Sequence, residues 1–121
     1  MEKKTSGFAS PTQGYEEQNI DLNRYLVDNP PASYYMRLES GEMTALGLPE
    51  GSLLIVDRSK APVHNSFVII RHEGQFCCRL MIREEGRTLF SNGTNLMVPG
   101  GETEIFGTII ASIKKYDSFS H

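Results

Sequence analysis

The 121-residue chain is poor in several features that define whole classes of protein. It has no tryptophan and two cysteines, and no apolar run approaches the roughly 20 residues that a membrane-spanning helix requires. Twelve Lys and Arg against fifteen Asp and Glu give a net charge of −3, whereas a protein that grips a phosphate backbone usually carries a basic excess. We therefore expect one soluble domain that neither spans a membrane nor binds nucleic acid directly.

The cysteines and histidines predict neither a disulfide nor a metal site. Cys77 and Cys78 are adjacent, and neighbours on a strand point to opposite faces, so a disulfide between them is not expected. His64, His72 and His121 show no metal-ligand spacing with cysteine or carboxylate residues. The first residues also lack the hydrophobic stretch of a signal peptide. The sequence thus predicts a cytoplasmic protein without metal or cofactor.

The first part of the chain predicts an extended arm over residues 1–19 and a single domain over 20–118. Residues 1–19 are polar and turn-forming without any period. Asp21 is a capping residue, and the apolar residues after it follow the i, i+3, i+4 spacing of a helix up to two prolines at 30 and 31. These apolar residues are Leu22, Tyr25 and Leu26. The pattern predicts one short helix whose apolar stripe packs into the core.

From residue 33 the pattern changes to that of β-strands. Runs rich in β-branched and aromatic residues are bounded by Gly, Pro, Asp and Ser. The runs cover 34–38, 52–57, 67–71, 75–83, 87–90 and 104–114. His72-Glu73-Gly74 and Glu84-Glu85-Gly86 predict three-residue hairpin loops, and Asn92-Gly93 predicts a further tight turn. The predicted fold class is mainly β with one minor helix.

Five segments resemble, in order and spacing, the UmuD branch of the LexA-type self-cleaving serine peptidases. They are GFASP at 7–11, IDLN at 20–23, SYY at 33–35, GSLLIVDR at 51–58 and IFGTII at 105–110. The resemblance covers about residues 7–115 and implies a compact, β-rich domain of the β-clip type. It further implies a homodimer that joins a UmuC-like translesion DNA polymerase in the SOS response.

The resemblance also implies a cleavage site, which here falls between Ser6 and Gly7. Six residues precede Gly7, so the family's long regulatory arm and the helix-turn-helix domain of its repressors are not expected in this chain. The chain therefore resembles the processed form, and its cleavage site is interpreted as vestigial.

The resemblance also implies two catalytic positions. In the family, the serine nucleophile lies in a Ser-Gly-x-Ser-Met motif, and the lysine base lies on a later strand. Ungapped alignment through 51–57 places Glu42, just before Met43, at the nucleophile position and Arg79 at the base position. A serine attacks only after a neighbour accepts its proton, and arginine stays protonated in proteins. We therefore expect no catalytic residues, and we expect Glu42 and Arg79 to be neighbours that form an ion pair.

Two further readings remain open for the same residues. Ser40 is a fallback nucleophile, although none of the five lysines (Lys3, Lys4, Lys60, Lys114 and Lys115) lies on the strand that should face it. His64, in the loop that starts at residue 61, is an alternative base for Ser40. The alternative is that the His64 side chain simply faces solvent. The chain is then either a silent regulatory subunit, an active autopeptidase that uses Ser40, or a decoy that forms mixed dimers with a UmuD relative.

The resemblance assigns the dimer interface to the last strand of the domain. Residues 104–115 have an apolar content that is high for the edge strand expected there. The predicted interface residues are Ile105, Phe106, Ile109 and Ile110. The plainer reading is that these side chains fill the core of one subunit.

Overall fold

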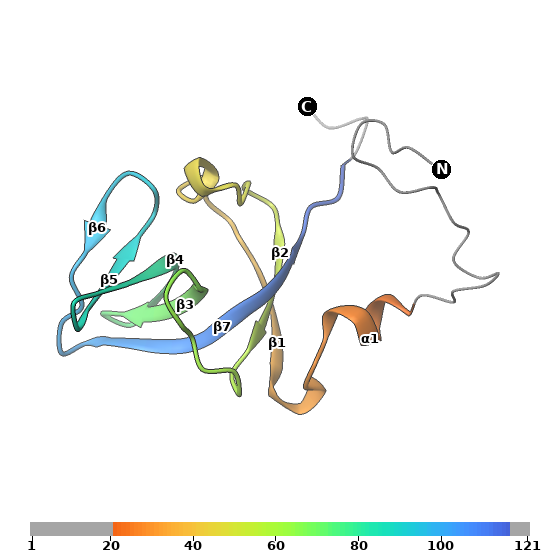
Figure 1. The fold of residues 1–121 in the computed structure, drawn as a ribbon. Coiled ribbons are helices and arrows are strands. Elements are labelled where there is room, and N and C mark those ends of the chain that lie inside the picture. Colours follow the sequence, from red (N-terminus) through yellow and green to blue (C-terminus); the bar gives the residue numbers. More distant parts are fainter. Residues whose placement is uncertain (1–20, 117–121) are drawn as a thin grey trace, which may run out of the picture.

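The computed structural model describes residues 21–116, and Figure 1 shows one twisted antiparallel sheet with a short helix beside it. The seven strands lie in the order β1-β2-β7-β3-β4-β5-β6. Their bounds are β1 (Ser33–Arg37), β2 (Leu53–Asp57), β3 (Phe67–His72), β4 (Gln75–Glu84), β5 (Arg87–Ser91), β6 (Leu96–Met97) and β7 (Thr103–Ile113). The helix is α1 (Leu22–Leu26), and two 3₁₀ turns cover Pro30–Ala32 and Thr44–Leu46. The predicted fold class, mainly β with one short helix, is confirmed.

Strand β7 lies in the middle of the sheet, which corrects the expectation of an edge strand. It pairs with β2 on one side and with β3 on the other, each time with one register shift. The two pairings overlap at Thr108, since residues 108–113 pair with β2 and residues 103–108 pair with β3. At the neighbouring Gly107, an added Cβ would lie 2.6 Å from Val56 Cγ1. Strand β7 therefore joins β2 to β3 within the sheet and is not an edge strand.

The two hydrophobic clusters lie along the sheet rather than between separate layers. The larger cluster contains fully buried Met43 and the β2 residues Leu54 and Val56, and Ile109 of β7 packs against it. The smaller cluster joins strands β3, β4 and β5. Its buried members are Val68, Ile70, Met81 and Phe90.

The two hairpin loops are shorter than predicted. Between β3 and β4 only Glu73 and Gly74 lie outside the strands, with φ of 53° and 81°. Glu85 and Gly86 repeat the arrangement between β4 and β5, with φ of 49° and 79°. Positive φ at both central residues is the type I′ geometry, whose twist matches that of the flanking strands, so a two-residue loop suffices.

Helix α1 is where predicted, but its apolar stripe is not in the core. The Asp21 carboxylate accepts the N–H of Asn23, and the helix ends after Leu26. Leu22 and Tyr25 are 64% and 75% exposed, and no residue of the helix is buried. The five-residue helix is too short to lay a full stripe against the sheet. No helix within 21–116 is long and apolar enough to cross a membrane.

Candidate functional site

The candidate site lies where the turn after β1 meets the middle of β4. The turn is held by backbone hydrogen bonds from Thr44 N to Gly41 O at 3.1 Å and from Leu46 N to Met43 O at 3.0 Å. The Met43 side chain is fully buried in the larger cluster and anchors the turn to the sheet. Glu42, next in sequence to this anchor, is thereby held at the surface of the domain.

Glu42 and Arg79 form the ion pair that the sequence predicted. Arg79 Nη1 lies 3.0 Å from Glu42 Oε1, and the two side chains are 13% and 41% exposed. Arg79 Nη1 also donates to the Cys78 carbonyl oxygen at 2.7 Å. The guanidinium is thus largely withdrawn from water and is held by two oxygen acceptors, which offset part of its desolvation.

Ser40 belongs to the same network. Its hydroxyl donates to Glu42 Oε2 at 3.2 Å, so the two carboxylate oxygens of Glu42 have different partners. The arrangement brings together Ser40, Glu42 and Arg79, but not His64, the alternative base. The Glu42 carboxylate is shared between the Ser40 hydroxyl and the Arg79 guanidinium.

A cleft of about 270 Å³ opens beside this network. Strand β1 and the turn after it form one part of its lining, and strands β2, β3 and β4 form the rest. The lining residues are Met36, Arg37, Leu38, Glu39, Ser40, Glu42, Leu54, Ile69, Phe76, Cys77 and Cys78. The cleft is large enough for one or two amino-acid side chains but small for a cofactor.

Cys78 forms part of the apolar floor of the cleft. Its side chain is buried, and this desolvation raises the pKa of the thiol to about 12. Arg79 lowers the pKa and Glu42 raises it, both less than burial does. Cys78 is therefore a neutral thiol near pH 7 and does not act there as a nucleophile.

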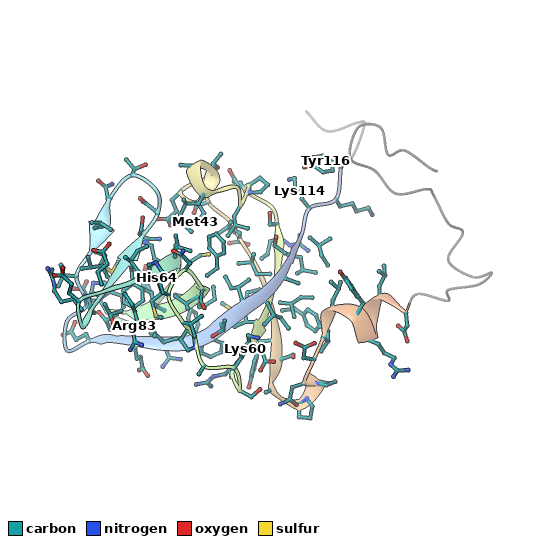
Figure 2. The ribbon with its side chains drawn as sticks, viewed as in Figure 1. Met43, Lys60, His64, Arg83, Lys114 and Tyr116 are labelled. Atoms are coloured by element: carbon teal, nitrogen blue, oxygen red, sulfur yellow. The ribbon has the colours of Figure 1, made fainter. Side chains whose placement is uncertain are left out.

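The alternative bases do not reach the cleft. Figure 2 labels His64 and Arg83, and His64 Nδ1 accepts the backbone N–H of Arg83 at 3.0 Å. The Lys114 ammonium donates to the Glu50 carbonyl oxygen at 2.9 Å, near the end of β7. Neither His64 nor any of the lysines within 21–116 lines the cleft. Ser6 and Gly7, the predicted vestigial cleavage site, lie outside the described residues, as do Lys3, Lys4 and the whole of the predicted arm.

The four predicted interface residues on β7 have different surroundings. Ile105 is 37% exposed, whereas Ile109 packs on the larger cluster. Phe106 is half-buried against the same cluster, and Ile110 lines a separate hollow beside α1. The four residues therefore do not form one continuous surface patch.

A row of aromatic rings that sequence reasoning missed crosses the sheet beside the cleft. Phe106 lies edge-on to Tyr34 of β1, with ring centroids 5.4 Å apart, and edge-on to Phe76 of β4 at 5.1 Å. Arg58 stacks over the Phe106 ring at 4.2 Å. Tyr34 and Phe76 are 47% and 49% exposed. Alternation along each strand could have suggested the exposure, but the meeting of three strands depends on the sheet order.

No group of three or more metal-binding side chains occurs within residues 21–116.

The sequence of this chain is similar to a known protein family and to several known proteins. A model of the Peptidase S24-like family matches residues 1–110. Protein SamA of Salmonella typhimurium strain LT2 is 32% identical over 115 residues, which is 94% of this chain and 82% of SamA. Protein ImpA of Salmonella typhimurium is 39% identical over 79 residues, and protein MucA of Escherichia coli is 36% identical over 84 residues. These alignments cover 64% and 69% of this chain, but just over half of each relative, 54% of ImpA and 58% of MucA.

The antiparallel sheet, and the cleft that Glu42 lines while paired with Arg79, are those of a Peptidase S24-like domain. The chain belongs to the Peptidase S24-like family and, within it, to the UmuD type.

Proposed function

We propose that this chain is a UmuD-like regulatory subunit of an error-prone translesion DNA polymerase in the SOS response, and that it does not cleave itself. The family relationship supports the UmuD-like role. The Glu42–Arg79 ion pair, with Nη1 and Oε1 3.0 Å apart, carries the proposal that cleavage is lost.

The chemistry of the pair opposes the family reaction at both positions. Attack on a peptide carbonyl requires a hydroxyl or thiol whose proton a neighbouring base accepts. Glu42 carries a carboxyl group in place of the hydroxyl, and Arg79 cannot accept a proton because a guanidinium stays protonated. The Glu42 carboxylate that contacts the Ser40 hydroxyl is also paired with Arg79.

The aromatic row supports the homodimer in this role. Tyr34, Phe106 and Phe76 present partly exposed rings on one face of the sheet, and exposed aromatic side chains are enriched at protein interfaces. Ile105 adds apolar surface on the same strand as Phe106. We therefore place the proposed dimer contact at this row, and Ile109 stabilises it from the core side.

The absence of cleavage is tested by incubating the purified chain at raised pH and measuring its intact mass. We expect an unchanged mass over days, because neither His64 nor any lysine within residues 21–116 lines the cleft. Loss of the mass of residues 1–6 would overturn this part of the proposal. Recovery of a translesion polymerase with the tagged chain from its own cells tests the other part, and its absence after DNA damage would contradict the role.

The contact between Ser40 and Glu42 keeps a second candidate in view, an autopeptidase in which Ser40 attacks and Glu42 accepts its proton. The 3.2 Å separation of Ser40 Oγ and Glu42 Oε2 is the observation that favours it. If the chain cleaves itself in this way, the Ser40→Ala variant does not. An unchanged cleavage rate in that variant would show that Ser40 is not the nucleophile. A decoy role, in contrast, requires mixed dimers on co-expression with a full-length relative.

A further inference from the structure

A small hollow beside the aromatic row carries charges of both signs. Its volume is about 120 Å³, and its lining residues are Arg58, Arg71, Glu104 and Phe106. Arg71 of β3 lies directly opposite Phe76 of β4 and Glu104 of β7 in the strand register. Directly opposite residues of an antiparallel pair lie on the same face of a sheet. The hollow therefore opens on the face that presents the aromatic row.

The Arg58 guanidinium is held in place but has no acidic partner. Its Nε donates to the Phe106 carbonyl oxygen at 2.8 Å, and its central carbon lies 4.2 Å from the centre of the Phe106 ring. These contacts fix the plane of the group, whereas its two terminal nitrogens form no ion pair among residues 21–116. A guanidinium that is fixed in this way loses little further side-chain entropy when it binds a carboxylate.

Glu104 is the loosely held anion of the same hollow. Its Oε2 lies 3.9 Å from Arg71 Nη1, and its side chain is 70% exposed. Arg71 also lies over the Phe76 ring, 5.1 Å from its centre. Although Arg58 and Glu104 both line the hollow, they form no ion pair with each other within one chain. One chain thus exposes a cation and an anion that do not satisfy each other.

Two opposite charges placed in this way are complementary to a second copy of the same surface. In a dimer with twofold symmetry, a contact of residue i with residue j is repeated as a contact of j with i. A twofold axis that crosses the mouth of the hollow brings Arg58 beside Glu104 of the partner subunit, and the reverse. A phosphate backbone is a poorer fit, because Glu104 repels it and the chain carries a net charge of −3.

We propose that Arg58 and Glu104 form two reciprocal ion pairs across the interface of the homodimer, on either side of a twofold axis that crosses the hollow. This inference rests on the homodimer of the proposed function and adds to it the charges that decide which chains pair. The aromatic row provides the apolar area of the contact, whereas the ion pairs provide orientation and selectivity more than affinity.

Charge reversal tests the reciprocity by sedimentation velocity at low salt. Arg58→Glu and Glu104→Arg each place like charges opposite one another in their own homodimer, and we expect each to weaken self-association about tenfold. Mixed in equal amounts, the two variants are expected to form heterodimers as tightly as the parent chain, because both contacts again join opposite charges. A loss that mixing does not restore would overturn the proposal, since a partner subunit cannot repair a defect within one chain.

The matched controls are Arg83→Glu and Glu102→Arg, which make the same charge changes at exposed residues that do not line the hollow. We expect each to self-associate like the parent chain and to show no preference for mixed dimers. Thermal unfolding followed by circular dichroism checks that all four variants are folded. If one reversal at the hollow does not fold, Arg58→Gln is expected to weaken association by a smaller factor without introducing repulsion. Equal weakening by the controls would overturn the assignment to the hollow.

Two further outcomes distinguish a failure of this inference from a failure of the proposed function. A parent chain that stays monomeric at every concentration would overturn the homodimer and the charge contact with it. A parent dimer that tolerates both single reversals would leave the homodimer in place and overturn only the pairing of Arg58 with Glu104.

Discussion

Arg79 lies at a position where a long cationic side chain is largely withdrawn from water. Its neighbours are the Glu42 carboxylate and the Cys78 carbonyl, at 3.0 and 2.7 Å. Removing one member of such a pair leaves the other without compensation, which costs more than the pair itself contributes. The exposure of Glu42 limits that cost, because water can reach its side of the pair.

Glu42→Gln is therefore expected to lower the free energy of unfolding by about 1 kcal/mol. Glutamine still accepts a hydrogen bond from Arg79 but no longer balances its charge. The measurement is urea denaturation at neutral pH. Glu104→Gln is the control, since its contact with Arg71 is 3.9 Å long and both side chains are exposed at 70% and 45%. An equal effect of the two substitutions would contradict the role given to the Glu42–Arg79 pair.

The buried thiol of Cys78 makes stability depend on alkaline pH. Its pKa rises from 9.0 to about 12 on folding, so the contribution is complete below pH 9 and is lost as pH rises from 9 toward 12. Between pH 8 and pH 10 the native chain is expected to lose about 1 kcal/mol more stability than Cys78→Val does. Urea denaturation at both pH values measures this, with Cys77→Val as control. Parallel losses in all three proteins would refute the assignment.

At the scale of the elements, the two type I′ turns set the register of β3, β4 and β5. The side-chain period of a strand is two, so a slip of one residue would exchange the faces of β4. Arg79 would then turn away from Glu42. The tight turns therefore hold the site in position as well as closing the hairpins.

Gly86→Ala is expected to destabilise the domain by about 1 kcal/mol, because φ there is 79° and an L side chain is strained in that region. Gly100→Ala is the matched control, since an added Cβ meets nothing within 4 Å and φ is not positive. Thermal unfolding measures both variants. A Gly100→Ala loss as large as that of Gly86→Ala would show that glycine replacement in general, rather than the turn, is responsible.

Local patterns predicted six of the seven strands, all except the two-residue β6, and the family resemblance predicted the meeting of Glu42 with Arg79. They did not predict that β7 enters between β2 and β3, since the pairing of distant strands leaves no local mark. The exposure of Leu22 and Tyr25 was missed for a related reason. An apolar stripe shows which side chains a helix could bury. Whether they are buried depends on whether the sheet offers a surface beside the helix.

At the scale of the whole molecule, the proposed dimer depends on the aromatic row. Phe76→Ser is expected to weaken self-association about tenfold, because a large, half-exposed ring is lost from the contact. Leu96→Ser is the control, since Leu96 is 61% exposed on β6 at the far end of the sheet. Sedimentation velocity over a range of concentrations measures both. Identical association of the two variants and the parent chain would place the dimer contact elsewhere.

The central position of β7 also affects the order in which the molecule forms. Strands β1 and β2 pair with each other, and β3 to β6 follow one another as a meander, but within the sheet the two groups are joined by strand pairing only through β7. Residues 103–113 are synthesised after every other strand. During translation the β1–β2 pair and the β3–β6 meander therefore lack the strand that joins them, and the sheet is completed only when β7 has left the ribosome.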